Sequence, residues 1–340
     1  MAGIGAVDVG AFAYVSGRAT PDRLTPRRLA DGFETVFGKH PGFRRNHAKG
    51  VSVTGEFVSG GAGAAVSQAA VFENDRRTPV TGRFSLSGGG PDAADATKTV
   101  RGLALRFDLP DGEQWRTAMV NLPVFQDRTP QGFYDRMLAF KALPHTGQPD
   151  PEKKAAFLAE HPETVRAMEL AKKHPPTSGF ADSTFNGLNA FHFTNSSGGS
   201  VPVRWSMVPL QTVRAPAKGP IGRNELFERL ISAFDSGPLR WRLVLTIAGP
   251  EDPLDDATLP WPDSRRKLDA GVLTLTSVHT EVSGNARDIN FDPTVLPRGI
   301  TVSDDPLLSA RAAVYAQSFA RRTGERDMKG AVKVTGRHGD

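Results

Sequence analysis

Short segments in which apolar and polar residues alternate are the feature that most constrains how this chain folds. In the first of them Val51, Val53 and Phe57 fall on one face, which is the period-two pattern of a half-buried β-strand. Comparable runs follow at residues 79–87, 100–109, 117–125, 189–195, 201–208, 241–247 and 272–279. Helix signals stand before, between and after them, at residues 26–37, 130–140, 151–174, 224–234 and 306–322. This order predicts an α+β fold: an antiparallel β-barrel or sandwich with helices packed outside.

Composition limits the classes of function. Of the 340 residues 39% are hydrophobic and 23% are charged, which is typical of a soluble globular protein. The net charge of +5 is dispersed along the chain, so we expect attraction to anionic ligands and no nucleic-acid partner. The absence of cysteine excludes disulfides, thiolate metal sites and thiol catalysis.

Three parts of the chain are distinguished by composition. Residues 1–20 are predicted to be a flexible arm or the remnant of an export or anchor segment, because their apolar stretch is too short to span a membrane. Residues 21–325 are predicted to form a single domain, since no repeat or low-complexity linker interrupts them. Residues 326–340 are basic and are predicted to be a flexible tail. We expect a soluble protein with no stable membrane span, and a cytoplasmic location is favoured over a periplasmic or exported one.

A histidine stands directly before the first predicted strand. The charged segment that carries Arg44 and His47 ends at Gly50, so the imidazole is placed at the mouth of the sheet. Histidine can shuttle protons near neutral pH, because its free pKa is about 6.5. The alternative is a structural histidine bonded to a backbone carbonyl, and this segment alone does not decide between the two.

The final predicted helix carries a second unusual group. Arg311, Tyr315 and Arg322 share one face at helical spacing, and Ser303 or Asp304 is predicted to cap the helix. A buried guanidinium needs a partner, so these arginines are either solvated on a surface helix or turned toward a ligand. In the second case Arg311, one turn away, favours the anion of the Tyr315 phenol.

Other common site motifs are absent. The chain has no His-Glu-x-x-His pair, P-loop, dinucleotide fingerprint or Gly-x-Ser-x-Gly elbow, and its remaining histidines are isolated and interpreted as structural or surface residues. The residues alone therefore indicate a barrel with one histidine and one tyrosine in unusual surroundings, and they do not reach a reaction.

Taken together, these stretches resemble the haem catalases. The motifs follow in the family's order: Arg-Arg-Asn-His47-Ala-Lys-Gly, Gly-Arg83-Phe-Ser85, Val-Arg101-Gly-Leu-Ala-Leu-Arg-Phe, Asn121-Leu-Pro-Val-Phe, Asp256-Ala-Thr-Leu-Pro-Trp-Pro, Phe291-Asp-Pro, Pro297-Arg-Gly-Ile and Arg311-Ala-Ala-Val-Tyr315. They span roughly residues 30 to 325, and the chain is much shorter than a full catalase. It therefore resembles the small catalase-related peroxidases, which implies a catalase-like barrel with an internal haem b.

The resemblance implies how the haem is held. Tyrosine is the haem ligand of catalases, so Tyr315 is expected to bind the iron, with Arg311 donating to the phenolate oxygen. Arg44, Arg83 and Arg322 match positions that pair with the haem propionates, where guanidinium forks suit carboxylates.

It also implies the catalytic residues. His47 is expected to take a proton from one peroxide oxygen and return it to the other, which is general acid–base catalysis. Ser85 is expected to orient the imidazole, and Asn121 to hydrogen-bond the peroxide.

The implied function is a haem peroxidase that reduces hydrogen peroxide or organic hydroperoxides with a small organic electron donor, with weak catalase activity. Asn46, Ser87 and Gln126 replace residues that are hydrophobic in catalases, which predicts a wider and more polar access route. Two alternatives remain open: a haem enzyme that rearranges fatty-acid hydroperoxides, as allene oxide synthases do, and a haem carrier without turnover. A homodimer is also left open.

Overall fold

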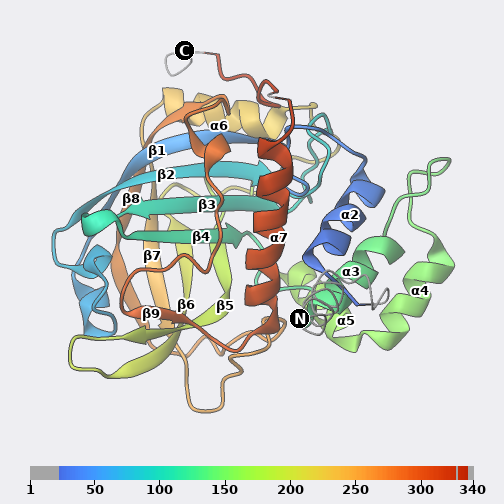
Figure 1. Cartoon of the computed structure of the whole chain (residues 1–340). Coiled ribbons are helices and arrows are strands. Elements are labelled where there is room, and N and C mark those ends of the chain that lie inside the picture. Colours follow the sequence, from blue (N-terminus) through green and yellow to red (C-terminus); the bar gives the residue numbers. More distant parts are fainter. Residues whose placement is uncertain (1–22, 327, 336–340) are drawn as a thin grey trace, which may run out of the picture.

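A closed antiparallel β-barrel forms the centre of the computed structural model, which describes residues 23–326 and 328–335 (Figure 1). Its strands run in the order β4-β3-β2-β1-β8-β7-β6-β5, and the pair Val120 and Asn186 closes the ring between β4 and β5. The bounds are β1 (Gly50–Ser59), β2 (Arg77–Leu86), β3 (Arg101–Asp108), β4 (Gln114–Val120), β5 (Phe185–Thr194), β6 (Ser200–Pro209), β7 (Leu239–Ile247) and β8 (Lys267–His279). A short β9 (Ile300–Val302) pairs with β5. The predicted barrel is confirmed, and each predicted run contains a strand, but residues 121–125 of the run at 117–125 lie beyond β4, and β9 was not predicted.

Six α-helices of the described residues lie outside the barrel. They are α2 (Pro26–Phe37), α3 (Pro130–Ala139), α4 (Pro151–Glu160), α5 (Pro162–Lys173), α6 (Glu225–Asp235) and α7 (Pro306–Thr323). Helix α7 crosses the outside of β1 to β4, and α2 to α5 gather on one side of it (Figure 1). None of the helices in the described ranges is long and apolar enough to cross a membrane.

Helix α7 begins at Pro306, and its cap lies one residue after Asp304 and two after Ser303, the two predicted caps. Its cap is Asp305, whose carboxylate accepts from Leu307 N at 2.9 Å, so the expectation of Ser303 or Asp304 is wrong. Proline favours the first helical position because its nitrogen has no hydrogen to leave unpaired. Pro306 occupies that position, and the residue before it therefore becomes the cap.

Large aromatic side chains fill the interior of the barrel. The rings of Phe84 and Trp241, which project from β2 and β7, lie 5.7 Å apart, and those of Trp115 and Trp205 lie 5.1 Å apart. All four side chains are buried. A cavity for a ligand must therefore lie elsewhere.

The outer face of β2 is buried as well, and that of β3 and β4 is partly buried. Residues 82–86 of β2 are all buried, so its two faces both pack against protein. On the outer face the neighbouring strands carry the small residues Gly102, Ala104 and Ala118, paired as Ala104 with Ala118. These small side chains leave space beneath α7, and this space holds the site.

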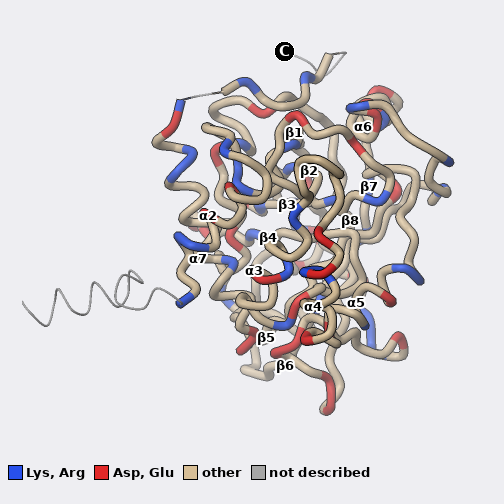
Figure 2. The backbone as a smooth tube through the Cα atoms, turned by 90° about the vertical axis from the view of Figure 1, so that its right-hand side faces the viewer, with Lys and Arg blue, Asp and Glu red and all other residues tan. Residues whose placement is uncertain are grey.

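The tail packs in part against the barrel. Val332 and Val334 are buried and belong to the main apolar cluster, and Val334 N donates to Thr280 Oγ1 at 2.9 Å. The expected flexible tail is therefore wrong for these residues, while residues 1–22, which contain the predicted arm, lie outside the described residues. Basic and acidic residues are interspersed along the chain, as predicted (Figure 2).

Candidate functional site

A mostly apolar cavity lies between the outer face of the barrel and helices α2, α3 and α7. Six of the eight predicted site residues line it: Arg44, His47, Arg83, Ser85, Arg311 and Tyr315. Arg322 lines a smaller pocket that shares Arg44 with the cavity. The structure thus brings together residues from the segment before β1, from β2 and from α7.

The segment before β1 is held by contacts on both sides. Arg45 forms ion pairs with Glu34 of α2, at 2.8 Å, and with Glu325 after α7. Asn46 Oδ1 accepts from His47 N at 3.0 Å and from Gly88 N at 2.8 Å. His47 itself has a φ of 55°, in the left-handed region that non-glycine residues rarely adopt. Such strain persists only where the surroundings enforce it, and it is common at functional sites.

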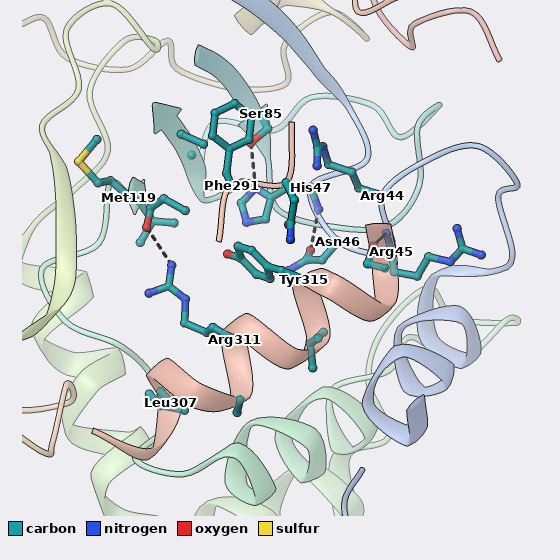
Figure 3. A pocket seen from close by; sticks show the side chains of 18 of the residues that line it. Arg44, Arg45, Asn46, His47, Ser85, Met119, Phe291, Leu307, Arg311 and Tyr315 are labelled. Carbon is teal, nitrogen blue, oxygen red and sulfur yellow. Dashed lines mark hydrogen bonds between the residues drawn. The ribbon is translucent and has the colours of Figure 1, made fainter. Parts of the chain in front are cut away.

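The imidazole of His47 is fixed by β2 and β3. Its Nδ1 lies 3.0 Å from Ser85 Oγ, so Nε2 is left for the cavity (Figure 3). Gly102 pairs with Ser85, and a Cβ at Gly102 would lie 3.1 Å from His47 Cε1. A residue with a Cβ at position 102 would press on the imidazole, so glycine is the residue that leaves the ring in place.

The electrostatic surroundings keep His47 neutral. Burial lowers its pKa to about 3, and the positive charges of Arg83, Arg311 and Arg44 act in the same direction. A neutral imidazole can accept a proton, and the unprotonated ring nitrogen of His47 is therefore available as an acceptor at physiological pH.

A cluster of Arg44, Arg83, Arg322 and the Glu281 carboxylate adjoins the histidine, and all of these residues but the half-buried Arg44 are buried. Arg83 donates to Glu281 with Nε at 2.9 Å and Nη2 at 2.7 Å, and its Nη1 donates to the His47 carbonyl at 2.9 Å. Arg44 Nη2 donates to the carbonyls of Ala286, Arg287 and Ile289.

The pKa values in this cluster reflect its excess of positive charge. Burial and then Arg83 and Arg322 lower the pKa of Arg44 well below its ordinary value, and burial lowers that of Arg322 to about 10. Burial opposes ionisation of Glu281, but the arginines, Arg83 first, lower its pKa. The cluster is therefore an anion-attracting site.

On the other side of the cavity, α7 presents Tyr315 and Arg311. Arg311 donates to Asn189 Oδ1 and, at 2.9 Å, to the Ala118 carbonyl, and its Cζ lies 5.8 Å from the centre of the Tyr315 ring. Asn189 in turn donates to Asp305, the cap of α7, at 2.7 Å. This chain of contacts fixes Arg311 beside Tyr315.

Asn121 is not brought to the cavity. Its Oδ1 accepts from Arg101 N at 2.8 Å, and it is not among the lining residues. Ser87 and Gln126 also lie outside the lining, so among the three departures from catalases only Asn46 contributes to the cavity wall.

Three further residues of the site were not found from the sequence. Gly102 had a signal, since it and Ala104 are small residues at alternate positions of a predicted strand. Glu281 and Asn189 gave no signal in the sequence. An acidic residue after a strand and an asparagine within one are both common on protein surfaces, so neither indicates a site. Only the fold brings them to Arg83 and Arg311.

Comparisons with known proteins agree with this geometry. The catalase family pattern matches residues 41–329. A catalase-related peroxidase of Synechococcus elongatus is 38% identical over 310 residues, which cover 88% of this chain and 89% of that protein. One of Mycolicibacterium paratuberculosis is 32% identical, covering 88% of this chain and 96% of its own.

Full-length catalases match over part of their length. The catalase of Pseudomonas syringae is 28% identical, covering 82% of this chain and 57% of the catalase. A solved bacterial catalase shares the fold with a TM-score of 0.73 at 23% identity, over 84% of this chain and 58% of that one. The chain belongs to the catalase family.

Proposed function

We propose that this protein is a haem peroxidase that reduces hydrogen peroxide or organic hydroperoxides with a small organic electron donor. The observation that supports this most is that His47, on the barrel side, and Tyr315, on α7, line one largely apolar cavity. The relatives named catalase-related peroxidase point to the same class of reaction.

The residues of the cavity fit a haem. Phe33, Phe125 and Phe133 contribute aromatic walls that suit a flat macrocycle, and Tyr315 supplies a phenol oxygen for iron. Arg322 Nε is buried without a hydrogen-bond partner in the described part of the chain.

The charges of the arginine cluster also suit a haem. Three guanidinium groups and the Glu281 carboxylate leave two positive charges unbalanced, which suits the two propionates of a b-type haem. We therefore propose haem b, held by Tyr315 and by the cluster of Arg44, Arg83 and Arg322.

When bound, the haem supplies the two electrons that cleave the O–O bond, and the organic donor restores them. For His47 Nε2 to act as a base, Nδ1 carries the proton and donates to Ser85 Oγ, 3.0 Å away. Nε2 then accepts the proton of one peroxide oxygen and donates it to the other, which leaves as water. Burial and the nearby arginines favour this start, because they keep the imidazole neutral.

A test of the proposal uses the haem-loaded protein and the His47→Ala variant. We expect a visible spectrum typical of a tyrosine-bound haem, peroxide-dependent oxidation of an organic donor, and loss of that activity in the variant with haem retained. His174→Ala is the matched control, since His174 is exposed and, among the residues that the structure describes, its side chain bonds to the Leu170 carbonyl of its own helix turn alone.

Other outcomes would identify the alternatives. Haem binding with equal, negligible turnover in the wild type and in His47→Ala would indicate a carrier. Consumption of a lipid hydroperoxide without any donor would indicate a rearranging enzyme. Oxygen evolution at full catalase speed with no donor oxidation would contradict a peroxidase.

A further inference from the structure

The chain after α7 forms one wall of the arginine cluster. It leaves the upper end of the helix in Figure 1 and contributes Met328 and Gly330 to a small pocket, which Arg44, Glu281 and Arg322 also line. Met328 is 41% exposed, so this part of the chain lies between the pocket and solvent. With the haem propionates paired to the cluster, as proposed above, the pocket lies at the propionate edge of the haem.

The segment is fixed before this pocket by Glu325. Glu325 Oε2 accepts from Gly42 N at 2.8 Å and from Arg45 Nη1 at 2.9 Å, and Arg45 Nη2 donates to Oε1. The bond from Arg45 lowers the pKa of Glu325, so its carboxylate is charged at neutral pH. Arg45 is itself buried and paired with Glu34 of α2. The chain therefore approaches the pocket from a fixed point.

The segment is fixed again after the pocket. Val332 and Val334 are buried in the main apolar cluster. Between the two attachments, residues 328–331 form no helix or strand. Gly330 passes so close to Glu281 that a Cβ there would lie 2.7 Å from the Glu281 carbonyl oxygen. Residues 328–331 are thus a strap that is attached at both ends and lies against the arginine cluster.

The strap affects how strongly charges in the cluster attract a ligand. Arg83, Glu281 and Arg322 are buried, and opposite charges attract more strongly when they are removed from water. Salt screens exposed ion pairs and screens buried pairs much less. Segments that few buried apolar side chains hold in place open more readily than the rest of a fold. Lifting the strap would therefore expose the cluster to water and salt without unfolding α7 or the barrel.

We propose that residues 328–331 shield the ion pairs between the haem propionates and the arginine cluster, and that lifting of this strap limits the rate of haem release. This inference rests on the proposed function, because it requires a haem in the cavity. The cluster supplies the charges that hold the propionates, and the strap keeps water and salt away from them.

The test measures the transfer of haem b from the loaded protein to excess apomyoglobin. Glu325→Gln removes the charge that holds one end of the strap, and Gly330→Ala presses the strap away from Glu281. We expect each variant to release haem about tenfold faster, the size of one lost hydrogen bond to a charged group. Release from the variants, but not from the wild type, should accelerate further as salt rises from about 0.05 M to about 0.5 M.

Glu225→Gln and Gly179→Ala are the matched controls. Glu225 Oε2 also accepts from a backbone nitrogen, that of Gly222 at 2.6 Å, and its carboxylate pairs with Arg229 on α6. In the part of the chain that the structure describes, a Cβ added at Gly179 meets no heavy atom within 4 Å beyond its sequence neighbours. Both controls should release haem at the wild-type rate.

The dimethyl ester of haem b separates shielding from a general loosening of the site, because its esterified propionates carry no charge. The two strap variants should release the ester at the wild-type rate. Equal acceleration for haem and ester, or haem release at the wild-type rate in both variants, would overturn the proposal. Acceleration in Glu325→Gln alone would assign the effect to the Arg45 ion pairs and would also overturn it. If the wild type took up no haem, the proposed function itself would fail, independently of the strap.

Discussion

At the scale of single residues, His47 combines backbone strain with an unusual proton affinity. Its φ of 55° is held by Asn46 and by the Arg83 bond to its carbonyl, and burial lowers its pKa to about 3. In the unfolded chain the pKa returns to about 6.5. This side chain therefore couples folding to pH.

The sign of that coupling is testable. Between about pH 3 and pH 6.5 the unfolded chain binds a proton at His47 that the folded protein does not, so stability rises with pH there. The contribution is fully present above pH 6.5 and is lost as pH falls, by up to about 1.4 kcal/mol per pH unit. We expect urea unfolding of the haem-free protein from pH 4 to 7 to show a smaller slope in His47→Gln. Equal slopes in both proteins would contradict the low pKa.

Gly102 gives a second prediction at this scale. A Cβ there would lie 3.0 Å from Ser85 Oγ and 3.1 Å from His47 Cε1, so Gly102→Ala should displace the imidazole by a few tenths of an ångström. We expect kcat/KM for peroxide to fall about tenfold, with a stability loss within the roughly 1–3 kcal/mol typical of overpacking. Gly179→Ala is the control, because in the described part of the chain no heavy atom beyond its two sequence neighbours lies within 4 Å of the added Cβ. Unchanged turnover in Gly102→Ala would show that the ring position is not critical.

Single residues also mark the limit of sequence-based prediction. His47, Ser85, Arg311 and Tyr315 were found because they stand in recognisable motifs, and the fold brings them to one cavity. The position of Asn121 was not predictable, since its Oδ1 accepts from the backbone N of Arg101, and a bond to a backbone N–H, which almost every residue carries, gives no signal in the sequence.

At the scale of elements, alternation located the strands but not the site. A period of two shows which residues share a face, and it leaves open whether one face or both are buried. In β2 both are, because the barrel interior lies on one side and α7 on the other. Arg83 and Ser85 alternate with apolar residues as an exposed polar face does, yet both are buried.

The position of α7 against the barrel depends on one connection to β5. Asn189 is buried and joins the Asp305 cap to Arg311. In Asn189→Ala the Arg311 guanidinium loses an acceptor, which costs about 1.5–3 kcal/mol for a hydrogen bond to a charged group. We also expect a shifted visible spectrum in the haem-loaded variant, since Arg311 lies beside Tyr315.

The control for this variant is Asn224→Ala. Asn224 precedes α6, and its side chain forms no cap hydrogen bond there. A stability loss in Asn189→Ala no larger than in the control, with an unchanged spectrum, would show that the connection does not position Arg311.

At the scale of the whole molecule, the chain after α7 returns to the barrel. Gly330 approaches the Glu281 backbone, and Val332 and Val334 join the main apolar cluster. The catalase pattern ends at residue 329, before these valines. The basic residues around these valines predicted a tail in solvent. Local composition could not show otherwise, because the core that the two valines join is assembled from distant strands.

Val332→Ser tests whether this return stabilises the fold. Val332 is 3% exposed, and burying a valine is worth about 1.5–3 kcal/mol, so we expect the free energy of unfolding to fall by about 2 kcal/mol. Val213→Ser is the matched control; Val213 is 60% exposed, and its change should stay within about 0.5 kcal/mol. The segment also lies against Glu281, so a loosened tail should weaken haem retention in Val332→Ser and leave it unchanged in Val213→Ser. Haem retention is measured by the transfer of haem to an acceptor protein. Equal stability and equal haem loss in both variants would show that the domain ends with α7.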